Sequence, residues 1–200
     1  MENSTLIMGS MYSGKSEELK RLIKRNEIAG KKCDIFKPSI DNRYSKNHIL
    51  THENAKILNI IDSNSAKKVV SRILGMSAYN IKTPNEIFDY IDKDTQVVGI
   101  DEVQFFDETI IDVVEELNKR NIKVIMSGLD MYSNGDIFEI TAKLAAKCKY
   151  VQKLHAVCVD CGQEAAYSYK LFNDNEAKID IGSEGKYIAL CEKCKEKRDN

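Results

Sequence analysis

The stretch "TLIMGSMYSGKS", residues 5–16, joins a short apolar run to the pattern G-x-x-x-x-G-K-S. The apolar run predicts a buried strand, and the apolar residues that follow the pattern recur at helical spacing. A glycine loop between a strand and a helix directs backbone N–H groups and a helix N-terminus at phosphate oxygens. The sequence therefore predicts a phosphate-binding loop, and the alternative is a chance glycine turn before a helix.

The predicted loop consists of Gly9, Ser10, Met11, Tyr12, Ser13, Gly14, Lys15 and Ser16. We expect Lys15 to reach the β- and γ-phosphates of ATP and Ser16 to hold Mg²⁺. Such a site also needs a carboxylate on a neighbouring strand. The apolar run "QVVGID" (96–101) supplies Asp101 for the metal, and Glu102, which follows it, is a candidate general base. The alternatives are a turn residue at Asp101 and a solvated carboxylate at Glu102.

Short apolar runs alternate with helical patterns over residues 1–150. This alternation predicts an α/β fold in which helices flank a mostly parallel sheet. The expected strands are 5–8, 33–36, 56–61, 96–101 and 122–130. The expected helices follow the glycine loop, cover 65–75 with Ser65 as N-cap and Gly75 as the stop, begin near Pro84, and cover 108–121 and 138–148.

Two C-x-x-C pairs stand in the last quarter of the chain, at Cys158 and Cys161 and at Cys191 and Cys194. Four thiolates in this spacing predict a closed, structural Zn²⁺ site, and a redox dithiol is the alternative. Helical periodicity fades after residue 150, so residues 151–200 are expected to form a small zinc-binding module beside an ATP-binding unit of residues 1–150. Cys33 and Cys148 lack ligand spacing and are expected in the core.

The charge balance does not indicate a nucleic-acid partner, because 30 basic and 31 acidic residues leave a net charge of −1. No run approaches the roughly 18 apolar residues of a membrane span. The N-terminal segment lacks the basic and apolar regions of a secretory signal. We therefore expect a cytoplasmic protein without a membrane partner.

The segment "DEVQFF" (101–106), taken with the glycine loop, resembles the thymidine kinase family of the cellular and poxvirus type. The resemblance continues along nearly the whole chain. It includes the segments "DNRYS" (41–45), "SGLDMY" (127–132), "VQKLHAVCVDCGQEAAYS" (151–168) and "IDIGSEGKYIALCEKC" (179–194).

This resemblance implies a P-loop NTPase fold of the RecA-like type with a small zinc-ribbon-like domain. It implies ATP-dependent phosphorylation of the 5′-hydroxyl of thymidine, and also of deoxyuridine, in pyrimidine deoxynucleoside salvage. It further implies a loop near residues 171–187 that closes over the nucleoside, and a homotetramer.

The resemblance assigns Glu102 as the base and places Arg43 near the phosphates, with Asp41 helping with metal or charge. The positions that match nucleoside-binding residues of the family are Met11, Gln104, Phe105, Leu129, Phe138, Ser168, Ile179, Ile181, Gly182 and Tyr187. The chain departs from the family pattern at Ser10, Ser133, Ser183 and Glu192. Ser133 stands where a pocket Phe is frequent, and neighbouring Tyr132 is the candidate replacement.

Two other functions compete with a nucleoside kinase. A nucleic-acid-dependent ATPase could use Asp101 and Glu102 to activate water and a zinc ribbon to grip DNA or RNA. Further helicase motifs and a basic excess are missing from the sequence, which disfavours this function. A regulatory module that binds ATP without chemistry would have no use for the acid pair.

Overall fold

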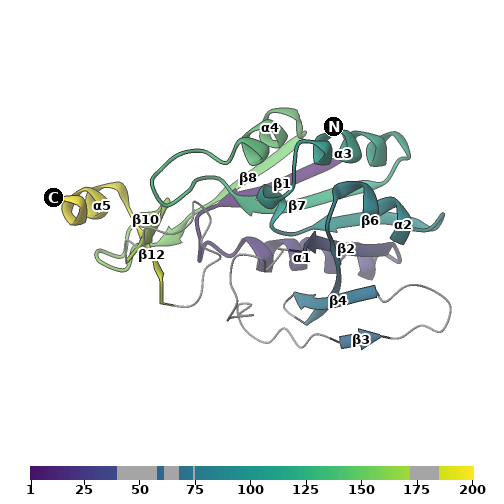
Figure 1. Ribbon diagram of the computed structural model, residues 1–200, viewed down its shortest axis with the longest axis horizontal. Helices are drawn as coiled ribbons and strands as arrows, with labels where there is room; N and C mark the ends of the chain where they lie inside the picture. The colour runs from purple at the N-terminus through teal and green to yellow at the C-terminus, as the bar shows by residue number, and fades with distance from the viewer. Residues whose placement is uncertain (40–57, 61–67, 74, 172–184) are drawn as a thin grey trace.

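The structure is a computed structural model, and it describes residues 1–39, 58–60, 68–73, 75–171 and 185–200 (Figure 1). In chain order its elements are β1 (Ser4–Gly9), α1 (Lys15–Ile28), β2 (Lys32–Pro38), β3 (Leu58–Ile60), β4 (Lys68–Ile73), β5 (Met76–Ile81), η2 (Pro84–Glu86), α2 (Ile87–Tyr90), β6 (Thr95–Ile100), η3 (Val103–Phe105), α3 (Thr109–Lys119), β7 (Lys123–Leu129), α4 (Glu139–Lys147), β8 (Tyr150–Leu154), β9 (Ala156–Val157), β10 (Glu164–Ala165), β11 (Tyr167–Lys170), β12 (Tyr187–Leu190) and α5 (Glu192–Asp199).

The main sheet has eight strands in the order β3-β4-β5-β2-β6-β7-β1-β8. The six strands from β5 to β8 in this order run parallel, whereas β3 and β4 join one edge in antiparallel pairing. The α/β class and the parallel sheet predicted from the sequence are confirmed. Because the strands are parallel, β1, β6 and β7 all end at the same edge, and the loops that follow them meet there.

Neighbouring residues on each central strand point to opposite faces of the sheet, as strand geometry requires. Leu6, Val98 and Val124 pack under α2, α3 and α4, whereas Ile7, Val97 and Ile125 pack against α1. Figure 1 shows α3 and α4 on one side of the sheet and α1 on the other. This two-sided burial explains the nearly continuous apolar runs in the sequence of these strands.

One expected helix is wrong. Residues 68–73, within the segment 65–75 that we expected to be helical, form β4, which pairs antiparallel with β5 from Val70 opposite Tyr79 to Ile73 opposite Met76. Gly75, expected to stop a helix, lies in the turn between these two strands. The physical reason is the β-branched content of "KVVSRI", which favours a strand once an adjacent strand can pair with it. The strand β5 was not expected either.

The end of the chain forms two small antiparallel ribbons, β9 with β10 and β11 with β12, followed by α5. Ala156, Ala165, Ala189 and Leu190 make a separate small apolar cluster together with cysteine side chains. In the part of the chain that the structure describes, no helix combines the length and the apolar character needed to cross a bilayer.

Candidate active site

The glycine loop leaves the carboxyl end of β1 and leads into α1, as the sequence predicted. Gly9 pairs with Leu129 of β7 on one side and with Leu154 of β8 on the other. A Cβ atom at Gly9 would lie 2.1 Å from the Leu154 carbonyl oxygen, so only glycine fits between these two strands. The loop therefore starts from a fixed position at the edge where the parallel strands end.

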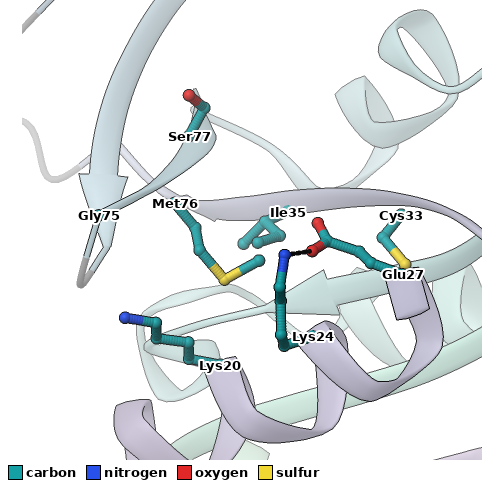
Figure 2. Close-up of a pocket in the computed structure, with 8 residues that line it drawn as sticks. All are labelled: Lys20, Lys24, Glu27, Cys33, Ile35, Gly75, Met76 and Ser77. Atoms are coloured by element: carbon teal, nitrogen blue, oxygen red, sulfur yellow. Dashed lines mark hydrogen bonds and ion pairs between the residues drawn. The ribbon is translucent and has the colours of Figure 1, made fainter.

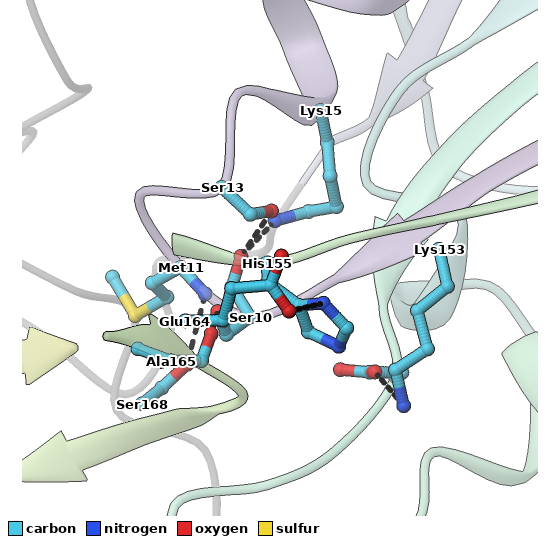
Figure 3. A network of polar contacts seen from close by, with 10 residues as sticks. Ser10, Met11, Ser13, Lys15, Lys153, His155, Glu164, Ala165 and Ser168 are labelled. Carbon is cyan, nitrogen blue, oxygen red and sulfur yellow. Dashed lines mark hydrogen bonds and ion pairs between the residues drawn. The ribbon is translucent and has the colours of Figure 1, made fainter. Parts of the chain in front are cut away.

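Lys15 lies across the mouth of this loop. Its Nζ donates a hydrogen bond to the Ser10 carbonyl at 2.5 Å, and the Ser13 hydroxyl donates to the same oxygen at 2.8 Å (Figure 3). Burial lowers the pKa of the Lys15 ammonium, while the carboxylates of Glu102 and Asp101 act in the opposite direction. The cation is thus held where the loop and both acids converge.

Asp101 and Ser16 face each other at the end of β6. The Ser16 hydroxyl lies 3.3 Å from Asp101 Oδ1 and 3.2 Å from Oδ2, and Ser127 at the end of β7 also donates to Oδ1. Burial raises the pKa of the Asp101 carboxyl to about 6, and the negative charge of Glu102 adds to this rise. An acid buried in this way gains from a nearby cation that stabilises its charged form.

Glu102 adopts a left-handed backbone conformation, with φ 54° and ψ 40°, between β6 and η3. This conformation is uncommon for a residue with a side chain and concentrates at functional sites. The Glu102 amide donates to Asp101 Oδ1 at 3.1 Å, and Gln104 Nε2 donates to Glu102 Oε2 at 2.5 Å. The turn in the backbone brings both acids to the same end of the sheet.

Three aromatic rings form a group, and one of them, Phe105, stands on η3, which directly follows the acid pair in the chain. Phe105 meets Phe138 edge-on with centroids 6.3 Å apart, and Tyr132 stacks on Phe138 with centroids 3.7 Å apart and ring planes inclined by 28°. Phe106, in contrast, is buried in the main core. Tyr132, the expected replacement for a ring at position 133, therefore belongs to the same aromatic group as the two predicted pocket residues.

The small ribbons at the end of the chain contact the glycine loop directly (Figure 3). The Ser10 hydroxyl donates to the Ala165 carbonyl at 3.2 Å, and the Met11 amide donates to Ser168 Oγ at 2.9 Å. The Tyr12 hydroxyl donates to the Tyr187 carbonyl at 3.2 Å. Three consecutive loop residues are thus bonded to the tail, and Met11 and Ser168, both predicted to contact nucleoside, are neighbours.

The four tail cysteines converge as predicted. The Sγ atoms of Cys158, Cys161, Cys191 and Cys194 all lie within 4.8 Å of one another, and none of them forms a disulfide. Tetrahedral zinc with Zn–S bonds of about 2.3 Å holds its sulfurs roughly 3.8 Å apart. The cluster therefore fits one Zn²⁺ ion. Arg198 of α5 pairs with Asp160 between the first two cysteines through two bonds of 2.8 and 2.6 Å.

Charged residues that no sequence motif identifies also lie at this edge. Lys37 near the end of β2 follows Phe36, whose carbonyl accepts the Asp101 amide at 2.9 Å. Burial lowers the pKa of the Lys37 ammonium, and the charges of Asp101 and Glu102 act in the opposite direction. Lys153 Nζ lies 3.0 Å from the buried Asp130 Oδ2 at the ends of β8 and β7. Their position at the ends of parallel strands was the only signal in the sequence that could have identified them.

Five predicted site residues lie outside the described residues. They are Asp41, Arg43 and the predicted nucleoside residues Ile179, Ile181 and Gly182. The described predicted residues converge on the carboxyl edge of the sheet and the adjoining tail, except the zinc ligands, which form their own cluster.

A surface hollow between α1, β2 and the start of β5 shares no residue with this site (Figure 2). Lys24 and Glu27 on its rim form an ion pair at 3.1 Å, and Cys33 has a pKa raised to about 11 mainly by burial. A thiol with so high a pKa is largely unreactive at neutral pH. The Cys33 thiol therefore supplies no reactive group to this hollow at neutral pH.

The comparison with protein families agrees with the geometry. The family model described as "Thymidine kinase" matches residues 3–195, which is nearly the whole chain of 200 residues. The phosphate loop, the acid pair and the cysteine cluster all lie within the matched range. The chain therefore belongs to the thymidine kinase family, enzymes that phosphorylate thymidine with ATP.

Proposed function

We propose that this enzyme transfers the γ-phosphoryl group of ATP to the 5′-hydroxyl of thymidine, with deoxyuridine as a second acceptor, in pyrimidine deoxynucleoside salvage. The observation that carries the proposal is the convergence of a phosphate loop, an acid pair and an aromatic group at one edge of the sheet. The phosphate loop would hold ATP, and the rings of Phe105 and Tyr132, which pack on the buried Phe138, would offer apolar surface for a planar base.

The proposed chemistry begins at Glu102. As the nucleoside 5′-oxygen attacks the γ-phosphorus, its proton passes to the Glu102 carboxylate. The bond between the γ-phosphorus and the β,γ-bridging oxygen breaks, and ADP leaves with the bonding electron pair. Lys15 would stabilise the charge that develops on the phosphate oxygens, a contribution expected of a cation in a water-poor site.

Ser16 and Asp101 are the residues that would hold Mg²⁺. Adjacent ligands of an octahedral Mg²⁺ ion at 2.0–2.1 Å lie roughly 3 Å apart, close to the 3.2 Å between the Ser16 hydroxyl and Asp101 Oδ2. The ion would neutralise charge on the β- and γ-phosphate oxygens when bound. The resemblance adds Arg43 as a further cation near the phosphates.

The tail residues support the nucleoside and the loop in this proposal. Ser168 and Tyr187 would line the nucleoside side of the site while they bind Met11 and Tyr12. Structural Zn²⁺ on the four cysteines would hold together the proposed tail module, residues 151–200. The first residues of this module, up to Leu154, belong to β8 and so join the main sheet of the ATP-binding unit, residues 1–150. A module this small lacks a large core of its own, and a closed metal site compensates for that.

The proposal is tested with labelled ATP and either thymidine or single-stranded DNA. Label that moves to thymidine supports it. ATP hydrolysis that depends on DNA and leaves thymidine unlabelled would reject it in favour of a nucleic-acid-dependent ATPase.

Three finer proposals have their own measurements. Deoxyuridine should compete with thymidine in the same assay. The resemblance proposes a homotetramer, which light scattering tests against the chain mass of 22.7 kDa. A cytoplasmic location is tested by fractionation of the source cells.

A further inference from the structure

Gln104 is buried, with 5% of its surface exposed, and both ends of its side chain are engaged. Its Nε2 donates to Glu102 Oε2 at 2.5 Å, and its Oε1 accepts the backbone N–H of Leu129 at 3.0 Å. Gln104 belongs to η3, Glu102 to the turn before it, and Leu129 to the end of β7. One side chain therefore connects the acid to the neighbouring strand.

The chemistry of the two partners fixes the orientation of the Gln104 amide. A backbone N–H can only donate, so it requires the amide oxygen, and an ionised carboxylate can only accept, so it requires the amide nitrogen. A flipped amide would lose both bonds. The arrangement thus holds one carboxylate oxygen of Glu102 and leaves the other able to receive a proton.

Gly128 of the neighbouring strand, β7, leaves room for the Gln104 amide. A Cβ atom at Gly128 would lie 2.8 Å from Gln104 Oε1 and 2.8 Å from Val103 Cγ1. Such contacts would displace η3 or the buried amide, and a displaced amide would no longer reach both partners. Glycine at position 128 therefore allows Gln104 to enter the space beside β7.

We propose that Gln104 is a positioning residue. Its side chain links the Glu102 carboxylate to the Leu129 backbone and so fixes the orientation of the base on the nucleoside side of the site. The inference rests on the proposed role of Glu102 as base. The family resemblance implied that Gln104 contacts the nucleoside directly. In this inference Gln104 acts on the reaction through Glu102 instead. Leu129 connects the two, because its side chain is a predicted pocket residue and its amide holds Gln104.

Two variants of the zinc-loaded full chain test this role. Gln104→Met keeps the length of the side chain and removes both hydrogen bonds. We expect kcat to fall about 10- to 100-fold, the loss that follows when a catalytic group is misplaced by about 1 Å, with KM for thymidine and ATP changed less than about threefold. Gln104→Glu keeps an acceptor for Leu129 but places a second carboxylate beside Glu102.

The pH profile distinguishes positioning from a merely structural role. Two adjacent carboxylates disfavour double ionisation, so in Gln104→Glu the acidic limb of kcat should move upward by about one pH unit or more. The matched control is Asn118→Leu, which removes another part-buried amide that bonds Asn3 and Ser4 at the opposite end of the sheet. This control should lower the melting temperature and leave kcat and the pH profile unchanged.

The outcomes separate this inference from the function it rests on. If Glu102→Gln retains turnover, the proposed base is wrong. If Glu102→Gln loses turnover but the Gln104 variants keep the wild-type kcat and pH profile, Glu102 stands and the positioning role is overturned. A raised KM with unchanged kcat would assign Gln104 to direct nucleoside contact and also overturn it. If Gln104→Met does not fold, Gln104→Glu decides.

Discussion

The Ser16 hydroxyl lies 3.2 Å from Asp101 Oδ2, although 85 positions separate these residues in the chain. The start of α1 supplies one oxygen and the end of β6 supplies the other, so the pair exists only after the parallel sheet has formed. Two oxygens at this spacing are what a small hard cation requires of a protein.

Asp101→Asn should abolish most Mg²⁺-dependent turnover. The amide keeps the shape of the side chain but removes the negative charge, and loss of metal stabilisation worth several kcal/mol corresponds to at least about a 100-fold decrease in kcat. Steady-state kinetics over a Mg²⁺ titration checks this. Ser16→Thr keeps a hydroxyl that the motif accepts and serves as the control. Wild-type turnover of Asp101→Asn at the same Mg²⁺ concentration would exclude the carboxylate as a ligand.

Asp101→Asn should also be more stable toward unfolding than the wild type at neutral pH in the absence of Mg²⁺. The pKa of Asp101 is raised to about 6 in the folded protein, above its ordinary value of 3.8, mainly by burial. The folded state therefore binds this proton more strongly, and the stabilisation present below pH 4 is lost as pH rises through about 6. An asparagine at this position does not ionise, so the free energy of unfolding of Asp101→Asn should exceed that of the wild type by up to about 3 kcal/mol at pH 7. Unfolding in Mg²⁺-free buffer at pH 4.5 and 7 measures the difference, which should fall to about a third of its pH 7 value at pH 4.5.

Glu102→Gln should bind ATP normally and lose about 10²- to 10⁴-fold in turnover, because an amide cannot accept the nucleoside proton. Calorimetric titration with ATP and a single-turnover assay measure the two effects separately. Glu108→Gln removes an exposed acid that pairs with Lys143 and should behave as the wild type. Near-normal turnover of Glu102→Gln would reject the assignment.

Tyr132→Ala should raise KM for thymidine and leave KM for ATP unchanged. Stacking of a base on an aromatic ring contributes about 1–3 kcal/mol, so the expected increase is roughly 5- to 150-fold. Tyr132→Phe keeps the ring that stacks on Phe138 and should remain near the wild type. An equal KM in Tyr132→Ala and the wild type would place the base elsewhere.

Metal analysis should find about one equivalent of zinc per chain. Cys191→Ser should lose that zinc and lower the melting temperature, because the thiolate cluster joins β9, β10 and β12 to α5. Cys33→Ser removes a thiol outside the cluster and should retain the metal. A folded wild-type protein without zinc would contradict the structural role.

The sequence predicted the parts of the site that depend on local pattern. Each of these parts has a fixed spacing in the sequence and can be identified without knowledge of tertiary contacts. They are the glycine loop, Asp101 at a strand end and the two cysteine pairs. The strand β4 was missed because its β-branched residues also fit a helical count, and only pairing with β5 decides between the two. Lys37 and the bond from Gln104 to Leu129 depend on which strands are neighbours, and a single sequence does not state that order.

The bonds from the tail to Ser10, Met11 and Tyr12 have a consequence for protein engineering. A fragment cut at residue 150 would carry every residue of the glycine loop. It would lack both β8, which pairs with Gly9, and three of the bonds that shape the loop. Nucleotide affinity should thus belong to the whole chain. A chimera that takes its tail from another family member would have to import matching partners for these three loop residues.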